Sequence, residues 1–354
     1  MNAQPDVAAD GQFEFSGTGS EYFRIWIVNL ALTILTLGIY SAWAKVRRLQ
    51  YFYRNTALLG NSFDYHGDPV AILKGRLIGI GLLAAYNVAA STSIKLGIAV
   101  FILLLIAVPW LVQRSICFRL ANSSYRGLRF RFNGSIADAY KVLLGWTFLS
   151  YITLGLLAPI AHQRLKAYQH NGSAYGTTPF SFTAEAGPFY TVYLKLLGLV
   201  VLPIVLFGVA AASLNLFAGL EGMHKNPQRF GKTLATLLMV LMMFYLALFL
   251  VVGPWFSARI QNLVWNHTAL ERHRFSSAVR ARDLLGIYVT NFIAIVLTLG
   301  LFKPFADIRL ARYRLTHMAL HPEGNLDEFF AREQQAVNAM GEETANIFDV
   351  DISF

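Results

Sequence analysis

The sequence predicts an all-α polytopic membrane protein with about seven hydrophobic helical segments built from internal repeats. Its 354 residues are 55% hydrophobic and 14% charged, whereas about 25% of the residues are charged in an average soluble domain. The apolar residues come in runs of about 20, long enough for a helix to cross a hydrocarbon layer of about 30 Å. The mean hydropathy of +0.47 supports the same class. The predicted segments are 22–42, 71–90, 95–113, 138–160, 190–218, 232–257 and 284–306.

The charge distribution indicates which side of the membrane the loops face and divides the chain into two parts. The net charge is +10, but after Arg314 there are eight acidic residues and one base, Arg332. An excess of lysine and arginine between membrane segments is typical of cytoplasmic loops. We therefore expect contact with anionic membrane lipids and no nucleic-acid partner. The predicted parts are a repeated membrane domain at 1–322 and an acidic C-terminal tail at 323–354.

An aromatic motif recurs five times along the chain. Each copy alternates apolar and polar residues, which is the period of a strand. The copies are predicted to be short cytoplasmic β-like segments, either paired into a small sheet or laid on the membrane. Because Phe13, Phe130 and Phe275 precede equivalent segments, and Phe63 and Phe130 follow equivalent motifs, we expect all copies on one side of the membrane. The copies begin at Phe13, Phe63, Phe130, Phe180 and Phe275, and the first reads Phe-Glu-Phe-Ser-Gly.

A Thr-Leu-Gly motif follows three of these copies by 23 residues, at Thr36, Thr153 and Thr298. Two hypotheses fit it. The segments that carry it enter and leave the membrane by the same face, with the motif as the turn, or they cross the membrane and the glycine permits close helix packing. The positive-inside rule favours the first hypothesis. The repeat-type segments are 13–60, 130–172 and 275–320, and the predicted crossing hairpins are 71–113 and 190–257.

Two asparagines lie at matched positions nine residues before the glycine of the Thr-Leu-Gly motif. Intramembrane amides either line a polar pathway or join helices by hydrogen bonds. The threonine and glycine of the Thr-Leu-Gly motif are likewise candidates either for a polar pathway or for helix packing. The candidate residues for a pathway or for helix packing are Asn29, Thr36, Gly38, Thr153, Gly155, Asn291, Thr298 and Gly300.

An aromatic residue and an arginine four residues later lie at the end of several hydrophobic segments. This spacing places a ring and a guanidinium on one helix face, with the ring at the membrane interface and the cation near the headgroups. The pairs are predicted to anchor the helices or to bind a lipid headgroup or another anionic ligand. The pairs are Trp43 with Arg47, Trp110 with Arg114, Trp255 with Arg259 and Phe305 with Arg309, and Arg164 belongs to a shortened copy.

Catalytic motifs are not found in this sequence. There is no zinc-protease, phosphate-binding or nucleophile-elbow motif, and Cys117 is the only cysteine, which excludes an intramolecular disulfide. We expect no enzyme activity, no cofactor and no metal.

The runs that begin at Phe13, Leu35 and Tyr51 resemble the bacterial YjgN family, also called the domain of unknown function 898 family. They read Phe-Glu-Phe-Ser-Gly-Thr-Gly-Ser-Glu-Tyr-Phe-Arg, Leu-Thr-Leu-Gly-Ile-Tyr-Ser-Ala-Trp-Ala-Lys and Tyr-Phe-Tyr-Arg-Asn-Thr, and the resemblance extends to about residue 322. It implies a multipass protein of the bacterial inner membrane and brings no established activity.

Two function classes follow from these observations. The first is transport or permeation of a small solute or ion, because internal repeats and broken helices recur among transporters. The alternative is a non-transporting membrane scaffold that binds anionic lipid, or a protein partner through the C-terminal tail. In both cases the C-terminus is predicted to be cytoplasmic.

Overall fold

The computed structural model describes residues 11–213 and 227–350, and its strands form one ten-stranded antiparallel sheet. The strands pair in chain order from β1 to β10. A bridge between Gln12 and Ala319 joins the two edges, so the sheet is a nearly closed barrel. The strands are β1 (Phe13–Phe15), β2 (Thr56–Leu58), β3 (Asn61–Tyr65), β4 (Ser123–Tyr125), β5 (Leu128–Phe132), β6 (Ser173–Tyr175), β7 (Thr178–Phe182), β8 (Thr268–Leu270), β9 (His273–Ser277) and β10 (Met318–His321).

Tight hairpins with two-residue turns join β2 to β3, β4 to β5, β6 to β7 and β8 to β9. Such turns require positive φ angles to match the twist of the strands. Leu59 and Gly60 have φ of 50° and 73°, and Arg126 and Gly127 have φ of 47° and 81°. The remaining strand pairs are separated in the chain by helices, so the barrel closes through long-range pairing.

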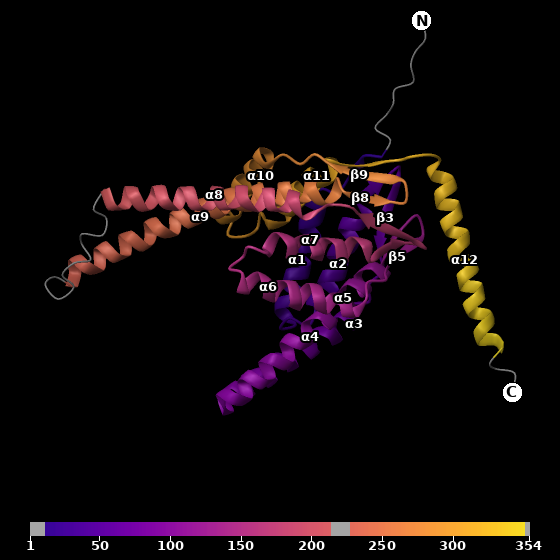
Figure 1. The fold of residues 1–354 in the computed structure, drawn as a ribbon, viewed down its shortest axis with the longest axis horizontal. Coiled ribbons are helices and arrows are strands. Elements are labelled where there is room, and N and C mark those ends of the chain that lie inside the picture. Colours follow the sequence, from indigo (N-terminus) through magenta and orange to yellow (C-terminus); the bar gives the residue numbers. More distant parts are fainter. Residues whose placement is uncertain (1–10, 214–226, 351–354) are drawn as a thin grey trace, which may run out of the picture.

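A pair of packed helical arms connects each odd-numbered strand to the next even-numbered strand, and the five pairs extend from the same side of the barrel (Figure 1). Three pairs are short and two are long. The helices are α1 (Gly19–Leu35) with α2 (Ser41–Arg54), α3 (Pro69–Thr92) with α4 (Ile94–Ala121), α5 (Ile136–Tyr140), the π-helix η1 (Lys141–Trp146) and α6 (Thr147–Ile152) with α7 (Ala158–Asn171), α8 (Ala186–Ser213) with α9 (Pro227–Trp265), and α10 (Ala281–Leu297) with α11 (Lys303–Thr316).

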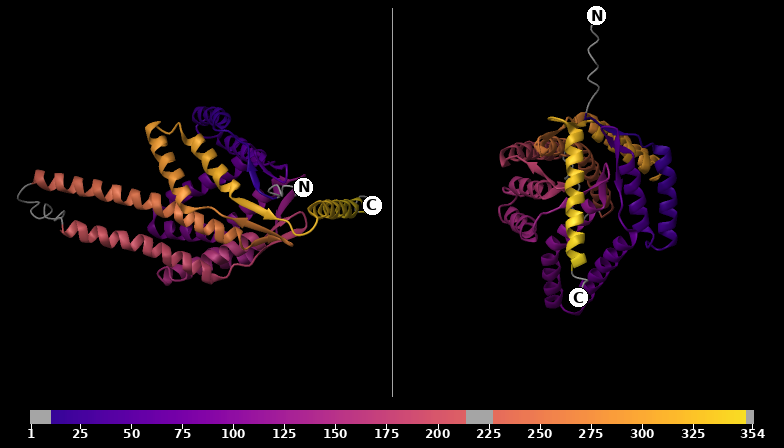
Figure 2. Two further views of the ribbon diagram at one scale, coloured as in Figure 1. Left: turned by 90° about the horizontal axis from the view of Figure 1, so that it is seen from above. Right: turned by 90° about the vertical axis from the view of Figure 1, so that its right-hand side faces the viewer.

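The helix pairs form a closed ring beneath the barrel. Each pair packs on the next through α2 and α3, α4 and α5, α7 and α8, and α9 and α10, and α11 packs back on α1. The right-hand view of Figure 2 shows the helices around a common axis, with α12 (Leu326–Val350) across the front. The helix ring and α12 therefore lie on opposite ends of the barrel.

Each short pair turns back at its Thr-Leu-Gly motif. In the first pair, Leu37 and Gly38 have φ of 50° and 93°, a left-handed conformation that glycine adopts easily. The Thr36 hydroxyl donates to the carbonyl of Leu32 (2.7 Å) and accepts the N–H of Tyr40 (2.9 Å), which ties the two helices together. The other two motifs have the same backbone angles and the same hydroxyl contacts, and the leucine at each tip is at least 94% exposed: Leu37, Leu154 and Leu299.

The structure corrects the predicted all-α class with about seven hydrophobic helical segments, three of them possibly re-entrant. Within the described ranges four helices, rather than seven, are long and apolar enough to cross a membrane, and the ten-stranded barrel is a major element. Three of the seven apolar runs contain a turn at Thr-Leu-Gly, which one of the two hypotheses for that motif included, so each of these runs forms two short helices. The strands are only three to five residues long, and every strand pair outside the four hairpins joins segments far apart in the chain. The four helices are Pro69–Thr92, Ile94–Ala121, Ala186–Ser213 and Phe230–Trp265, which lie in the predicted crossing hairpins.

Five phenylalanines form a closed ring inside the barrel. The rings stack or tilt against one another around the barrel, and neighbouring ring centroids are 6.1 to 6.5 Å apart. Aromatic pairs at this separation attract each other beyond the gain from burying apolar area. Each ring comes from the first residue of an aromatic motif copy: Phe13, Phe63, Phe130, Phe180 and Phe275.

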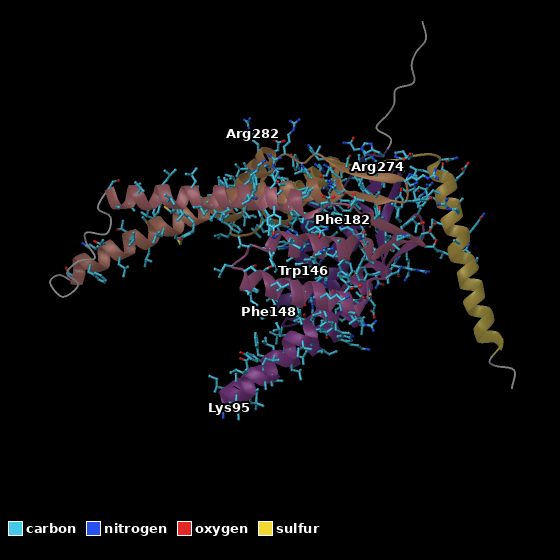
Figure 3. The ribbon with its side chains drawn as sticks, viewed as in Figure 1. Lys95, Trp146, Phe148, Phe182, Arg274 and Arg282 are labelled. Carbon is cyan, nitrogen blue, oxygen red and sulfur yellow. The ribbon has the colours of Figure 1, made fainter. Side chains whose placement is uncertain are left out.

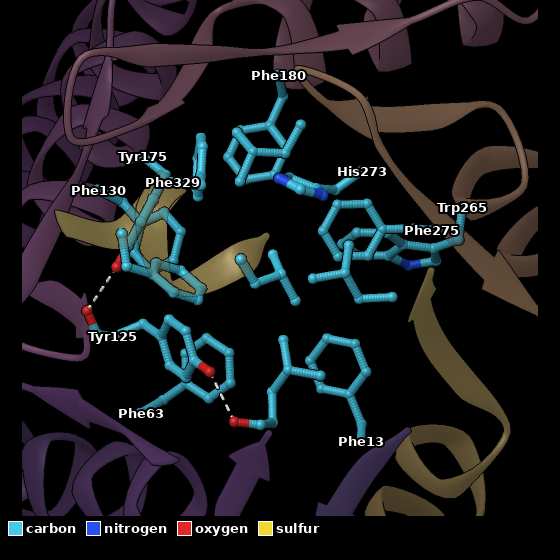
Figure 4. Close-up of a pocket in the computed structure, with 15 residues that line it drawn as sticks. Phe13, Phe63, Tyr125, Phe130, Tyr175, Phe180, Trp265, His273, Phe275 and Phe329 are labelled. Atoms are coloured by element: carbon cyan, nitrogen blue, oxygen red, sulfur yellow. Dashed lines mark hydrogen bonds between the residues drawn. The ribbon is translucent and has the colours of Figure 1, made fainter. Parts of the chain in front are cut away.

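Two buried tyrosines from the even-numbered strands join alternate strands of the barrel, across β3 and β5. The Tyr125 hydroxyl donates to the carbonyl of Leu58 (2.6 Å), and the Tyr175 hydroxyl donates to the carbonyl of Tyr125 (3.0 Å). Both side chains contribute rings to the aromatic core (Figure 4). Buried hydroxyls of this kind need a partner, so these contacts fix the register of β2, β4 and β6.

We predict that Gly300→Ala destabilises the protein by about 1 kcal/mol or more, because an L-residue in the left-handed region is strained. No atom lies within 4 Å of the added methyl group, so backbone strain is the only cost. Gly286→Ala in α10 is the matched control, since its surroundings are equally open and its φ is not in the left-handed region. Thermal unfolding in detergent should show a lower Tm for the first variant alone. Equal Tm values for the two variants would contradict this role of the turn.

Candidate functional site

A basic pocket of about 500 Å³ lies between α1, α2, α3 and α11. Arg48 contacts Asp307 at 3.7 Å, and Lys303 also pairs with this carboxylate. Arg76 on α3 donates to the Ser41 hydroxyl. The pocket thus holds four cations and one carboxylate, which leaves an excess of positive charge that favours an anionic ligand. We call it the lateral pocket, and its charged lining residues are Lys45, Arg48, Arg76, Lys303 and Asp307.

The two matched asparagines differ in their partners. Both are 7% exposed. Asn291 donates to the carbonyl of Ala306 (3.3 Å) and accepts from the Arg309 guanidinium (2.7 Å). Asn29 lines the lateral pocket, and its Oδ1 has no hydrogen-bond partner in the described ranges. A buried amide oxygen without a partner is costly, so Asn29 is a less well satisfied polar group than Asn291.

A second basic pocket of about 630 Å³ lies between α7, α9 and α11. Arg314 donates to the hydroxyls of Ser257 (2.6 Å) and Tyr288 (3.2 Å), and its buried Nε has no partner in the described part of the chain. Burial and the charge of the nearby Arg119 lower the pKa of Lys166. We call this the central pocket, and its polar lining residues are Lys166, His170, Ser257, Gln261 and Arg314.

The predicted aromatic and arginine pairs form an exposed belt around the helix ring. Each of the five arginines is exposed on the helix that leads into an even-numbered strand. Arg114 lies over the ring of Trp110 at 5.8 Å, and Arg259 lies over Trp255 at 6.0 Å. Arg47 lies instead over Tyr40, and Arg164 over Trp146. Trp43 stacks on Tyr40, while Phe305 packs on Phe23 and Phe302. The arginine belt consists of Arg47, Arg114, Arg164, Arg259 and Arg309.

The predicted pathway or packing residues do not come together at one place. Three threonines and three glycines are at the tips of the short helix pairs, and Asn29 and Asn291 are nearer the barrel on α1 and α10. Of these eight residues only Asn29 lines either basic pocket. The tip residues are Thr36, Gly38, Thr153, Gly155, Thr298 and Gly300.

Sequence reasoning missed the cations that face the two pockets. The available signal was a second arginine five residues after a belt arginine, as in Arg309 with Arg314. Arg119 has the same spacing from Arg114 but lines neither pocket. Five residues correspond to about 140° around a helix, so the second cation points away from the belt. Arg48, Arg76 and Lys166 carry no such repeated spacing, because their pockets are assembled from different helices.

No group of three or more metal-ligating side chains is found in the described ranges. The acids and the histidine near β3 have separate structural roles. Asp64 pairs with Arg54 (2.9 Å), His66 contacts the Ser124 hydroxyl, and Asp68 caps α3 by accepting the N–H groups of Val70 and Ala71.

Comparison with known proteins places the chain in a bacterial group. The family model described as "Bacterial protein of unknown function (DUF898)" matches residues 10–347. Inner membrane protein YjgN of Salmonella typhimurium is 26% identical over 357 residues, which covers 88% of each chain. Inner membrane protein YjgN of two Escherichia coli strains is 30% and 31% identical over 156 residues, or 44% of this chain and 39% of each relative. No solved structure matches significantly.

The two asparagines provide a matched prediction about stability. Asn291→Ala removes two hydrogen bonds, one of them to a guanidinium, and should lower the free energy of unfolding by about 2 kcal/mol. Asn29→Ala removes an amide oxygen that has no partner, so it should cost clearly less. Thermal or denaturant unfolding of both variants in the same detergent measures the difference. A larger loss for Asn29→Ala would overturn the assignment of partners.

Proposed function

Because the chain belongs to the bacterial DUF898 family, whose curated relatives are named inner membrane proteins, we propose that it resides in the inner membrane and binds anionic lipid there. The lateral pocket is the proposed headgroup site. The observation that carries the proposal is its four cations, Lys45, Arg48, Arg76 and Lys303, against the single carboxylate of Asp307. The proposal includes no catalysed reaction and no cofactor, since binding needs only charge and shape.

Helix lengths support a membrane surface at the arginine belt. Arg47 is ten residues from Leu37, or about 15 Å of helix, and Arg114 is 21 residues from Ser93, or about 31 Å. The first distance corresponds to about half of a hydrocarbon core of about 30 Å, and the second to its full thickness. The short pairs with their exposed apolar tips thus fit one leaflet, and the first long pair fits the whole bilayer. Lys95 lies at the far end of the first long pair, and Arg274 lies at the barrel end (Figure 3).

The exposure of the spanning helices supports lipid binding rather than an enclosed pathway. At most 17% of the apolar window of any of the four candidate spans is buried inside the protein. Helices that line a pathway bury one face against each other, whereas these present most of their surface outwards. The lateral pocket adjoins this apolar surface through Arg76, which lies on the candidate span α3. A lipid bound there would place its headgroup in the pocket and its acyl chains against the helices.

The barrel and the C-terminal tail are proposed to face the cytoplasm. The arginine belt contributes five cations at the barrel side of the proposed membrane region, which is the pattern of the positive-inside rule. An even number of spans also returns the chain to the side on which it began, as the four candidate spans do.

Permeation of a small solute or ion is the second candidate function. The position of the central pocket beneath the barrel favours it, because the pocket contains Lys166 and Arg314 inside the helix ring. Flux of chloride or phosphate into liposomes that contain the purified protein would support this candidate. No flux together with anionic lipid binding would leave the first proposal standing alone.

We predict that Arg48→Gln with Arg76→Gln weakens the binding of dansyl-labelled phosphatidylglycerol at least tenfold, because two charges leave the lateral pocket. The control, Arg129→Gln with Arg131→Gln, removes the same charge from exposed positions on β5. Energy transfer from tryptophan to the dansyl group measures binding in detergent, and labelled phosphatidylcholine reports nonspecific uptake. Equal affinities for the two double variants would exclude the lateral pocket as the headgroup site.

Sidedness is tested with single cysteines in a Cys117→Ala background. Ser62→Cys lies at an exposed position on β3, and Ser93→Cys lies between the two long helices α3 and α4. In intact cells a membrane-impermeant maleimide should label only the cysteine at position 93. Labelling at position 62 from outside would reverse the proposed orientation.

A further inference from the structure

The first turns of α12 close the end of the barrel that is opposite the helix ring. Phe329 and Phe330 are 4% and 9% exposed, and their rings line a cavity of about 150 Å³. Phe330 meets the rings of Tyr125 and Tyr175, and Phe329 packs edge-on against His273 (Figure 4). The tail therefore supplies part of the aromatic core, although it is not part of the sheet.

A carboxylate one turn further along α12 is held by four donors. Glu333 is 3% exposed. One of its oxygens accepts the N–H groups of Thr177 (2.7 Å) and Thr178 (3.1 Å) and the Thr177 hydroxyl (2.9 Å), and the other accepts the Thr178 hydroxyl (2.7 Å). Burial raises the pKa of Glu333, but these hydrogen bonds outweigh burial and the pKa is lowered overall. The turn between β6 and β7 is thus shaped as a carboxylate receptor.

Charged side chains also contact α12 around the end of the barrel. Arg126 pairs with Asp327 (3.1 Å) and lies 4.4 Å from the ring centroid of Phe330. Arg332 pairs with Glu271 and lies over Phe329 at 5.4 Å. Exposed ion pairs contribute little to affinity, so Phe329, Phe330 and the Glu333 carboxylate are the groups of α12 that this end of the barrel recognises.

The strand pairing of the barrel does not include α12. Within the described ranges the sheet is paired from β1 to β10 and closes through a bridge between its two edges, while α12 hydrogen-bonds to β7 only through the Glu333 side chain. The contacts come from the first turns of the helix, up to Val337, and the rest of α12 runs away from the barrel (Figure 1). Gly324, with φ of 89°, lies in the short connection that follows β10. The tail therefore occupies the end of the barrel while a short connection attaches it to β10.

We propose that the end of the barrel is a peptide-binding site, which the chain's own tail occupies and which a helical segment of another protein can take. The matching segment carries two adjacent aromatic residues followed three residues later by a carboxylate, as in Phe329, Phe330 and Glu333. The tether gives the tail a high effective concentration, so a partner segment must bind more tightly than the tail or arrive when the tail is displaced. This proposal is independent of lipid binding.

The test uses the full chain with a weakened tail, Phe330→Ala with Glu333→Gln, and a fluorescein-labelled peptide of residues 324–340. The peptide should bind this variant in detergent at least tenfold more tightly than it binds the wild-type chain, whose site is occupied. A peptide with Glu333→Gln should lose at least tenfold in affinity, because it offers the receptor no charge. The control peptide carries Glu328→Gln, at an exposed position whose carboxylate contacts only Asn325 of the same tail.

Two results would overturn the proposal. The first is a failure of the peptide to bind a weakened-tail chain whose near-UV circular dichroism still shows the packed aromatic core. The second comes from the single full-length variants and does not depend on the peptide. Hydrogen exchange across residues 326–337 should be faster in Glu333→Gln than in Glu328→Gln, and equal exchange would show that the receptor does not hold the tail.

Discussion

The closed ring of five phenylalanines is the interaction on which the rest of the structure depends. Each strand is only three to five residues long, and isolated strands of that length are not stable. Phe13 and Phe275 lie far apart in the chain, yet their ring centroids are 6.5 Å apart. The buried aromatic area compensates for the entropy of closing the long helical connections between the strands.

The barrel in turn sets the arrangement of the helices. Because each even-numbered strand is preceded by a helix in the same register, the exposed arginines of the belt recur at equivalent positions in all five helix pairs. The five belt arginines therefore lie at one level of the helix ring. The helix pairs differ on the side of the arginine belt away from the barrel, where a Thr-Leu-Gly turn shortens three pairs and continuous apolar helices lengthen the other two.

The two ends of the barrel therefore differ in chemistry. At the helix end, Asn29 and Arg314 line basic pockets, and each has one buried polar atom without a partner in the described ranges. At the other end the tail supplies both apolar rings and a fully hydrogen-bonded carboxylate. Trp265 lines both the central pocket and the barrel cavity, so one side chain separates the charged side from the aromatic side.

The sequence by itself determined the membrane class, the two long hairpins and the positions of the aromatic motifs, because apolar run length and alternation are local properties. It did not determine the barrel, since the partners of Phe13 come from segments up to about 260 residues away. It left the Thr-Leu-Gly motif open between a turn and a close helix contact, because glycine suits both, and the structure shows the turn at Gly38. The basic pockets were also decided by tertiary structure. Arg48, Arg76 and Lys303 converge only when α2, α3 and α11 pack around the ring, and no spacing within one helix encodes that convergence.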